Sequence, residues 1–561
     1  MIALLKMGMF IRKKKTPKTP SRVSIQIVES CRKGDKVSQT IVRHVGIGET
    51  VDEIEQLMAL AKTIKARLEE ERQPTLPLFT PEKLIEQKTE TIDDDGPLDV
   101  NLKNLREEQR FNEGIIDVFG NLYDQLNFNK IFTGRHAKLN NSILKSCVMA
   151  RLANPSSKLR TSELLEDDFA IRLPVDKIYR MMKQLDVNSS RVHELVRNST
   201  VDLLDQKVNI LFYDVTTLYF ESFTPDEIRN FGFSKDCKFK ETQLVMAMIT
   251  TTNGLPITYK IFPGNTQETK TLLPVIEELR EQYNVDDIDF AADRGMFSDD
   301  NLSKLEKENI KYVIAAKLKN MSKKTKEEIL KINDNNDDND YKLMELEHKG
   351  RRLIVNYSPA RANKDRKDRE RLIDRVKKIA NKDGKVEVKK LVNNNGTKKY
   401  LKFEKEKKSI AQINEEKIKL EEQWDGIAGY VTNSTSSAHE VISRYKGLWE
   451  IEESFRINKH DLKIRPIFHR EENKIKAHLD ICFLSYALAR QLSYRYEVQQ
   501  GERISFNVAR NELLKVQASV LYDRSTKKRY IMPSKISSLA KKLYSILGLK
   551  KSQAPYRLNK M

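Results

Sequence analysis

The sequence predicts an α/β protein built around one mixed β-sheet, and three observations carry this prediction. Runs of β-branched and aromatic residues cluster between positions 208 and 318. Helical patterns separate the later runs, whereas the earlier ones flank Asn253-Gly254, a strong signal for a tight hairpin. The charged segment 321–423 then separates this cluster from one more apolar run at 427–433. We therefore expect a sheet core that is interrupted by an insertion domain.

The composition narrows the class of partner. With 561 residues, the chain has room for about three to five domains of roughly 100–200 residues each. Its 101 Lys and Arg exceed its 81 Asp and Glu by 20, and the isoelectric point is near 9.4. Enzymes for small metabolites have no need of such an excess of positive charge. A polyanion, in contrast, binds a positively charged protein tightly because binding releases its counterions. Nucleic acid is the partner class we expect, and an ordinary basic surface is the alternative.

Cysteine usage and hydropathy argue against several other classes. The four cysteines form no CxxC pair, which indicates neither a zinc site nor a disulfide framework and fits a reducing compartment. No run of about 18 uncharged apolar residues occurs, so we expect no membrane span. The apolar residues 1–10 are too few for a signal peptide. These features predict a cytoplasmic protein.

Residues 1–75 predict a small N-terminal domain. Apolar and polar side chains alternate within 9–48 on both sides of a polar turn, which is typical of a β-hairpin. We expect Arg12–Lys15 to form a basic arm of this hairpin, and residues 50–72 to form a helix. A linker at 76–104, with prolines and an acidic patch, ends the domain.

A helical region is predicted at 105–205. Its apolar spacing indicates helical segments near Ile115–Leu126, Ile143–Leu152 and Ile178–Leu185. Interleaved Arg and Lys side chains are compatible with a DNA-binding bundle, but no helix-turn-helix spacing stands out. A structural collar is an equal alternative.

The first part of the core, 206–320, contains an unusual carboxylate. Asp214 lies in the middle of the apolar strand 208–220, where an isolated carboxylate costs several kcal/mol unless it is paired or binds a metal. A hairpin, a helix at 268–283 and a strand ending at Asp293 come next, and a helix and a last strand complete this part. The order is that of a ribonuclease-H-like mixed sheet, in which neighbouring first and fourth strands would bring the two aspartates together.

The insertion domain, 321–423, carries more than half of the net charge. Residues 321–420 alone contribute +11 of the total of +20. Charged helical runs near 364–380 and 403–422 indicate either a solvated face or a surface that contacts DNA.

The second part of the core, 424–495, resumes with the strand at 427–433. It contains the stretch YKGLWEIEESFRINK, residues 445–459, and a further apolar helix near 475–492 that we expect to pack against the sheet. The C-terminal region, 496–561, is basic, and its pattern predicts mainly helices at the end without chemistry that can be assigned.

The stretch at 445–459 places several polar groups on one face of a helix predicted over 437–459. Tyr445, Glu452 and Lys459 are seven residues apart, so they return to nearly the same face every two turns. Glu453 is rotated by about 100° from that face. We therefore expect Glu452 to be functional, as the third carboxylate beside the two aspartates, and its neighbour to be a surface residue.

Three carboxylates on two strands and a helix suit a pair of Mg²⁺ or Mn²⁺ ions, which lie about 3.5–4 Å apart in two-metal sites. Magnesium prefers carboxylates and water, so we expect His460 and His469 to be surface or structural residues. Asp289 provides an internal control. It precedes Asp293 by four residues, or ~13 Å of strand, and therefore lies beyond reach of the same metal.

The motifs YDVTTLYFES, ADRGMFS and YKGLWEIEESFRINK resemble those of the DDE transposases of bacterial insertion sequences. The resemblance is to the group with a Y-(2)-R-(3)-E-(6)-K signature and a large insertion before the catalytic glutamate. Tyr445, Glu452 and Lys459 match three of the four signature positions, whereas Leu448 stands in place of the arginine. The likeness covers both parts of the core and, more weakly, the N-terminal hairpin.

The resemblance implies a reaction and assigns roles. Asp214, Asp293 and Glu452 would bind the metal ions. Tyr445 and Lys459 would hold the phosphates of the double-stranded DNA at the element's end. Beside these family positions, we expect Arg456 and Trp449 to contact DNA as well. The reaction would be hydrolysis of a phosphodiester at the element's end, followed by attack of the freed 3′-hydroxyl on target DNA, with a homodimer holding two ends. A structure-specific nuclease on the same fold and a captured copy that only binds DNA are the alternatives.

Overall fold

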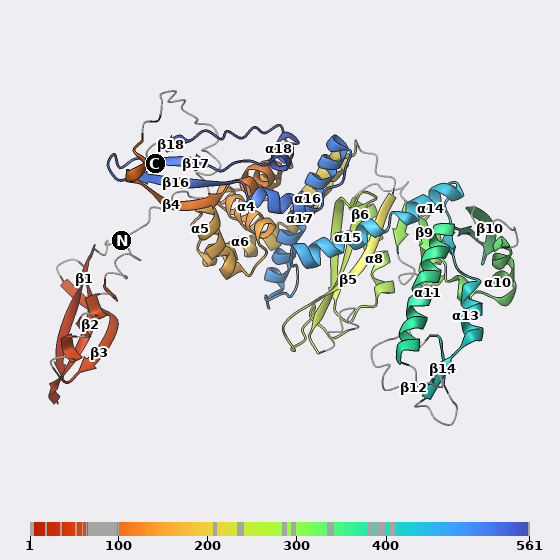
Figure 1. The fold of residues 1–561 in the computed structure, drawn as a ribbon, viewed down its shortest axis with the longest axis horizontal. Helices are drawn as coiled ribbons and strands as arrows, with labels where there is room; N and C mark the ends of the chain where they lie inside the picture. The colour runs from red at the N-terminus through yellow and green to blue at the C-terminus, as the bar shows by residue number, and fades with distance from the viewer. Residues whose placement is uncertain are drawn as a thin grey trace. The chain divides into compact units, whose positions relative to one another are not determined.

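Two units make up the chain in the computed structural model, Met1–Thr80 and Pro81–Met561 (Figure 1). The described residues are 5–16, 19–33, 36–50, 53–55, 57–58, 60–62, 64–65, 98, 100–205, 210–232, 240–282, 289–292, 299–333, 341–379, 385–387, 399–403 and 410–558. Asp293 and most of the predicted linker at 76–104 lie outside them. No helix within the described ranges is both long and apolar enough to cross a membrane.

The N-terminal unit has three strands where the sequence predicted a hairpin. These strands pair antiparallel in chain order and are β1 (Leu5–Thr16), β2 (Thr19–Lys33) and β3 (Lys36–Gly48). Arg12–Lys15 belongs to β1 and is not a separate arm, because the strand continues through these residues in register with β2. Val23 and Ile25 form a small core with Ala61, one of the helical residues described between 53 and 65.

The second unit begins with a strand and the predicted helical region. The strand β4 (Leu105–Asn112) was not predicted. The helical segments after it are η2 (Ile116–Gly120), α3 (Asn121–Gln125), α4 (Ala137–Ala153), α5 (Lys158–Phe169), α6 (Val175–Val187) and α7 (Ser189–Leu203). The helix α16 (Glu472–Gln500) packs against α4, α6 and α7, and its apolar residues share one core with them. The helical region is therefore joined firmly to the second part of the core.

The central sheet has eight strands in the order β10-β11-β15-β9-β8-β5-β6-β7. The elements that the sequence predicted here are β5 (Ile210–Tyr219), β6 (Gln243–Thr251), β7 (Pro256–Pro263), α8 (Leu272–Gln282), β8 (Asp289–Ala292), α9 (Asp299–Lys307) and β9 (Lys311–Ala315). β5, β6 and β7 are antiparallel, whereas β5, β8 and β9 are parallel, which confirms the ribonuclease-H-like arrangement. The hairpin between β6 and β7 contains Gly254, whose φ of +68° favours glycine.

The two faces of β5 belong to different cores. Its odd-numbered residues, such as Tyr213, share a core with α8 and α9. Its even-numbered residues, such as Phe212, share a core with α16 and with α15 (Trp449–Arg456). Because side chains alternate along a strand, Asp214 lies on the α15 face. Figure 1 shows α15 running between the sheet and α16.

The insertion extends the central sheet instead of standing apart from it. Its first hairpin supplies β10 (Lys342–His348) and β11 (Arg351–Tyr357), and β11 pairs with β15 (Ile427–Thr432). The boundaries predicted at 321–423 therefore cut through the sheet. The other elements are α10 (Lys323–Leu330), α11 (Pro359–Ile379), β12 (Lys385–Glu387), β13 (Leu401–Phe403), β14 (Ile410–Ile413) and α13 (Glu415–Glu422). The run 403–422, expected to be helical, thus contains a strand before its helix.

The C-terminal region contains strands, unlike the mainly helical end expected for 496–561. Its elements are α17 (Phe506–Leu514), β16 (Gln517–Asp523), β17 (Arg529–Pro533), α18 (Ser538–Ser545) and β18 (Tyr556–Leu558). These strands and β4 form one sheet in the order β18-β17-β16-β4. The Asn112 side chain donates hydrogen bonds to the carbonyl oxygens of Leu513 and Leu514, at 3.1 and 3.0 Å.

Candidate active site

Asp214 lies near the middle of β5 and is half-buried on the face that α15 covers. Its Oδ1 accepts a hydrogen bond from the backbone N–H of Val215 at 2.7 Å. Thr216, two residues further on the same face, is buried, and its hydroxyl has no hydrogen-bond partner among the described residues. This face of β5 therefore carries two oxygen-bearing side chains at neighbouring positions.

The helix predicted over 437–459 is broken into separate segments. α14 (Ala438–Lys446) ends before Gly447, α15 begins at Trp449, and a π-helical segment, η9 (Ile457–Asp461), follows. A Cβ atom at Gly447 would lie 2.7 Å from Cζ of Phe212, so only glycine permits this close approach to β5. The break means that the uninterrupted helical face expected for Tyr445, Glu452 and Lys459 is absent.

The adjacent glutamates of α15 have different surroundings. Ile451 and Phe455 face the core, whereas Glu452 is exposed and makes no hydrogen bond or ion pair with any other described residue. Glu453 is half-buried and receives two hydrogen bonds from the Arg456 guanidinium, at 2.6 and 2.5 Å. The surface residue expected at 453 is therefore the more buried of the two glutamates, and an arginine engages it.

Asp293 lies outside the described residues and directly follows the last residue of β8. That residue, Ala292, pairs with Tyr213, which directly precedes Asp214. Asp289 is at the opposite end of β8 and pairs with Ile210. Among the residues that the structure describes, no three His, Cys, Asp or Glu side chains gather as a metal site.

Tyr445 and Lys459 flank α15 on its two neighbouring segments. Tyr445, in α14, is half-buried, and its ring centroid lies 4.9 Å from that of Tyr430 in β15. Lys459, in η9, is also half-buried, and its Nζ lies 6.0 Å from the ring centroid of Phe455. An aromatic ring therefore lies beside each of these two residues.

The other residues expected to contact DNA differ in their exposure and in their contacts with the rest of the protein. Trp449 is 49% exposed, and the guanidinium of Arg503 stacks over its ring at 5.0 Å. Arg456 bonds to Glu453 and lies 3.3 Å from a carboxylate oxygen of Asp461, and these partners raise its pKa. Leu448, at the arginine position of the signature, is buried in the core. Nothing at this position is therefore available to a phosphate.

Glu450 is a residue that the sequence did not single out. Its carboxylate is 5% exposed and accepts hydrogen bonds from Arg490 at 3.0 Å and from Arg503 at 2.7 Å. These arginines come from α16 and from the segment after it. They hold α15 through a buried ion pair, and no local pattern could reveal it because the partners are 40 and 53 residues away.

The same contacts reach the hairpin between β6 and β7. Arg490 also donates to the carbonyl oxygens of Asn253 and Gly254, and the Tyr486 hydroxyl donates to Gly254 at 2.6 Å. A Cβ atom at Gly254 would lie 2.4 Å from Nη2 of Arg490. This network joins α15, α16 and the tip of the hairpin, so it orients the helix that carries Glu452.

Two family models match this chain, and both describe transposases. Residues 206–488 match a family model described as the transposase DDE domain, and residues 11–75 match the N-terminal domain of IS1634 family transposases. The search of solved structures returned a piggyBac transposase synaptic complex with hairpin DNA, at 10% identity and a TM-score of 0.34, covering 72% of this chain and 76% of that one. The comparison with curated proteins found no match.

Proposed function

The chain belongs to the DDE transposases and is a DNA transposase of an insertion sequence, and on this premise we propose how its residues act. Asp214, Asp293 and Glu452 are the catalytic carboxylates. They serve hydrolysis of the phosphodiester at the element's end and then attack of the freed 3′-hydroxyl on target DNA. In both steps an oxygen displaces another at phosphorus in line, so no covalent bond to the enzyme is needed.

The observation that carries this proposal is the packing of α15 on the Asp214 face of β5. It brings the exposed and unpaired Glu452 to the same side of the sheet as Asp214. The pairing of Tyr213 with Ala292 supports the inclusion of Asp293. Asp214 and Asp293 directly follow these two paired residues in the chain.

We propose that the carboxylates hold two Mg²⁺ or Mn²⁺ ions; DDE transposases in general use divalent metal ions. The residues present fit such ions, since carboxylate oxygens are the ligands that magnesium prefers. The buried hydroxyl of Thr216, which lacks a described partner, adds a further oxygen beside Asp214. Bound ions would activate the attacking oxygen and stabilise the leaving one. The chain's own contacts position the helix that carries Glu452 against the strand that carries Asp214.

We propose that Tyr445, Lys459 and Trp449 contact the backbone of the bound DNA. Arg456 contributes less, because its guanidinium is already engaged by Glu453 and Asp461. A homodimer would hold two element ends at once, as joining both ends to one target requires.

The test incubates purified protein, Mg²⁺ and a labelled duplex carrying the element's ends. Glu452→Gln and Asp293→Asn should each lower strand cleavage by about 10²–10³-fold, the size of several kcal/mol of lost transition-state stabilisation. The matched controls Glu453→Gln and Asp289→Asn should cleave at the wild-type rate.

The products decide between the proposed reaction and its alternative. Joined target DNA establishes strand transfer, while nicks without joining would reduce the activity to that of a nuclease. If a control carboxylate proved as important as its catalytic neighbour, the assignment of these residues would be wrong.

A further inference from the structure

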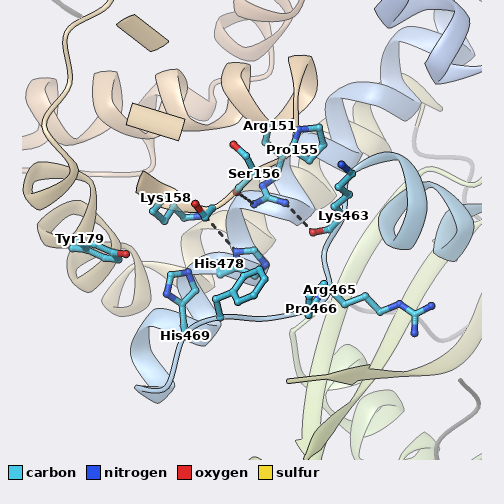
Figure 2. A pocket seen from close by; sticks show the side chains of 12 residues that line it. Arg151, Pro155, Ser156, Lys158, Tyr179, Lys463, Arg465, Pro466, His469 and His478 are labelled. Atoms are coloured by element: carbon cyan, nitrogen blue, oxygen red, sulfur yellow. Dashed lines mark hydrogen bonds between the residues drawn. The ribbon is translucent and has the colours of Figure 1, made fainter. Parts of the chain in front are cut away.

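A basic pocket lies beside the active-site half, between α4, α5, α16 and the segment that follows η9 (Figure 2). Its volume is about 150 Å³, whereas a single water needs roughly 10–15 Å³. Six of its lining side chains are basic, namely Arg151, Lys158, Lys463, Arg465, His469 and His478. None of the described residues that line it is acidic. The pocket therefore has room for a small anion and carries only positive or neutral groups.

The floor of the basic pocket is formed by two buried cations. Arg151 and Lys158 are each 4% exposed. The Arg151 guanidinium donates to backbone carbonyl oxygens, the nearest being that of Leu462 at 2.7 Å. Nζ of Lys158 donates to Nδ1 of His478 at 3.3 Å (Figure 2). Neither cation has a carboxylate partner among the described residues, although a buried charge normally requires one.

His478 holds Lys158 in place through a defined tautomer. Its Nε2 lies 3.1 Å from the carbonyl oxygen of Ile464, so the ring donates there and leaves Nδ1 as the acceptor for the ammonium. The lysine is thus oriented by a neutral ring, and its charge remains uncompensated.

The pKa values of three bases in the pocket are lowered, first by burial and then by the neighbouring cations. Burial, with the charge of Arg151, lowers the pKa of Lys158 to about 8. Burial and the nearby cations likewise lower the pKa of His469 to about 3, and they lower the pKa of His478. A bound anion would oppose these effects, because it stabilises the protonated form of each group.

We propose that the basic pocket binds a phosphate monoester group between Arg151 and Lys158. A phosphate offers the acceptor oxygens and the negative charge that these two cations lack. α5 begins at Lys158, so the positive end of its helix dipole adds to the attraction. A terminal phosphate suits the buried floor better than an internal one, which would bring two sugars into the same space. The exposed Lys463 and Phe468 leave the mouth open to solvent.

The position of the pocket indicates a DNA end as the source of this phosphate. The segment lining it bonds to the end of β5, where Ile467 N–H donates to the Tyr219 carbonyl oxygen at 3.3 Å. Tyr219 is five residues from Asp214, or ~16 Å along the strand, which about five base pairs span at 3.4 Å each. A 5′-phosphate on DNA held at the carboxylates could therefore reach it. This source rests on the proposed function, whereas the phosphate site itself does not.

The first test measures thermal unfolding of the full chain in phosphate and in chloride at equal ionic strength. Phosphate should raise the melting temperature of the wild type in a concentration-dependent way, as binding to the native state alone does. Lys158→Met should lose this response, and it should remain folded because it replaces a buried charge by an apolar chain of similar length. Lys183→Met, an exposed lysine on α6, is the matched control and should respond like the wild type.

Either of two results would overturn the site, namely no phosphate response in the wild type or an undiminished response in Lys158→Met. Asp214→Asn should keep the full response, so a failure of the proposed catalytic residues would leave this test unaffected.

The second test compares duplexes with a 5′-phosphate and with a 5′-hydroxyl. Wild-type protein should bind the phosphorylated duplex about tenfold more tightly, the size of one charge-assisted hydrogen bond, and Lys158→Met should abolish the difference. Equal binding of both duplexes by a wild type that does respond to phosphate would identify free phosphate as the ligand and reject the DNA end.

Discussion

The buried and the exposed sides of α15 place the same residue type in opposite surroundings. Glu450 is enclosed and held by two arginines, whereas Glu452, two residues later, is exposed and has no described partner. A carboxylate that finds its partners within the chain holds the structure together. One without such partners is available to a cation from outside. Whether a glutamate has a charged partner within the chain therefore distinguishes structural from functional carboxylates better than their spacing in the sequence does.

The basic pocket repeats this contrast with the sign reversed. Arg490 is a half-buried cation with a carboxylate partner, and Lys158 is a buried cation without one among the described residues. Burial lowers the pKa of Lys158, which is the expected response to an unsatisfied charge. Three predictions test how the presence or absence of an oppositely charged partner affects stability, its pH dependence and DNA affinity.

The largest effect should come from breaking the ion pair at Glu450. Glu450→Gln removes a buried carboxylate and leaves the half-buried Arg490 without its counter-charge, so we expect a loss of about 3 kcal/mol in the free energy of unfolding. Chemical denaturation measures this loss. Glu453→Gln is the matched control and should lose less than about 1 kcal/mol, because its ion pair with Arg456 is partly open to solvent. Similar losses in both variants would remove the distinction between the two sides of α15.

A smaller effect should appear in the pH dependence of stability. The pKa of Lys158 is lowered from 10.5 to about 8 by folding, so between these values the unfolded chain binds more protons than the native one. Stability therefore rises with pH through this window, and the full penalty is present below pH 8. Lys158→Met should lack this rise when its unfolding is compared with that of the wild type over the same range. An identical pH profile would show that Lys158 is not held as an unpaired charge.

The smallest effect should be seen in DNA affinity. Lys459→Ala should reduce the slope of log affinity against log salt by about 0.9, the value for one phosphate contact. Arg456→Ala should reduce it by less, because Glu453 and Asp461 already neutralise part of its charge. Titrations of a labelled duplex over a series of salt concentrations provide both slopes. A larger change for Arg456 would mean that DNA displaces its carboxylate partners.

The central sheet could be predicted because local sequence patterns specify most of its strands. The apolar run around Asp214 and the hairpin signal at Asn253-Gly254 each specify a strand or a turn from adjacent residues. Their order then restricts the topology to few solutions. The place of β10 and β11 could not be predicted in this way, because these strands lie within a highly charged segment and join the sheet only through β15.

The candidate site was predicted in part for the same reason. Asp214 and Glu452 stand out by local context, whereas the arginines that hold Glu450 come from distant parts of the chain. The break at Gly447 depends on how closely α14 and α15 approach Phe212, a tertiary contact. A glycine within a helical pattern was the one available signal for it. The basic pocket had no such signal, because three separate segments supply its walls.

The pairing of β4 with β16 has a consequence for synthesis of the protein. Asn112 stands opposite Gln517, so the sheet cannot close until more than 400 further residues have been made. Until then β4 has no strand partner at either of its edges, which is a hazard for association with other chains. Translation that stops before β16 would leave that edge permanently open. Completion of the C-terminal strands therefore gives β4 its partner only after the catalytic half of the chain has been made.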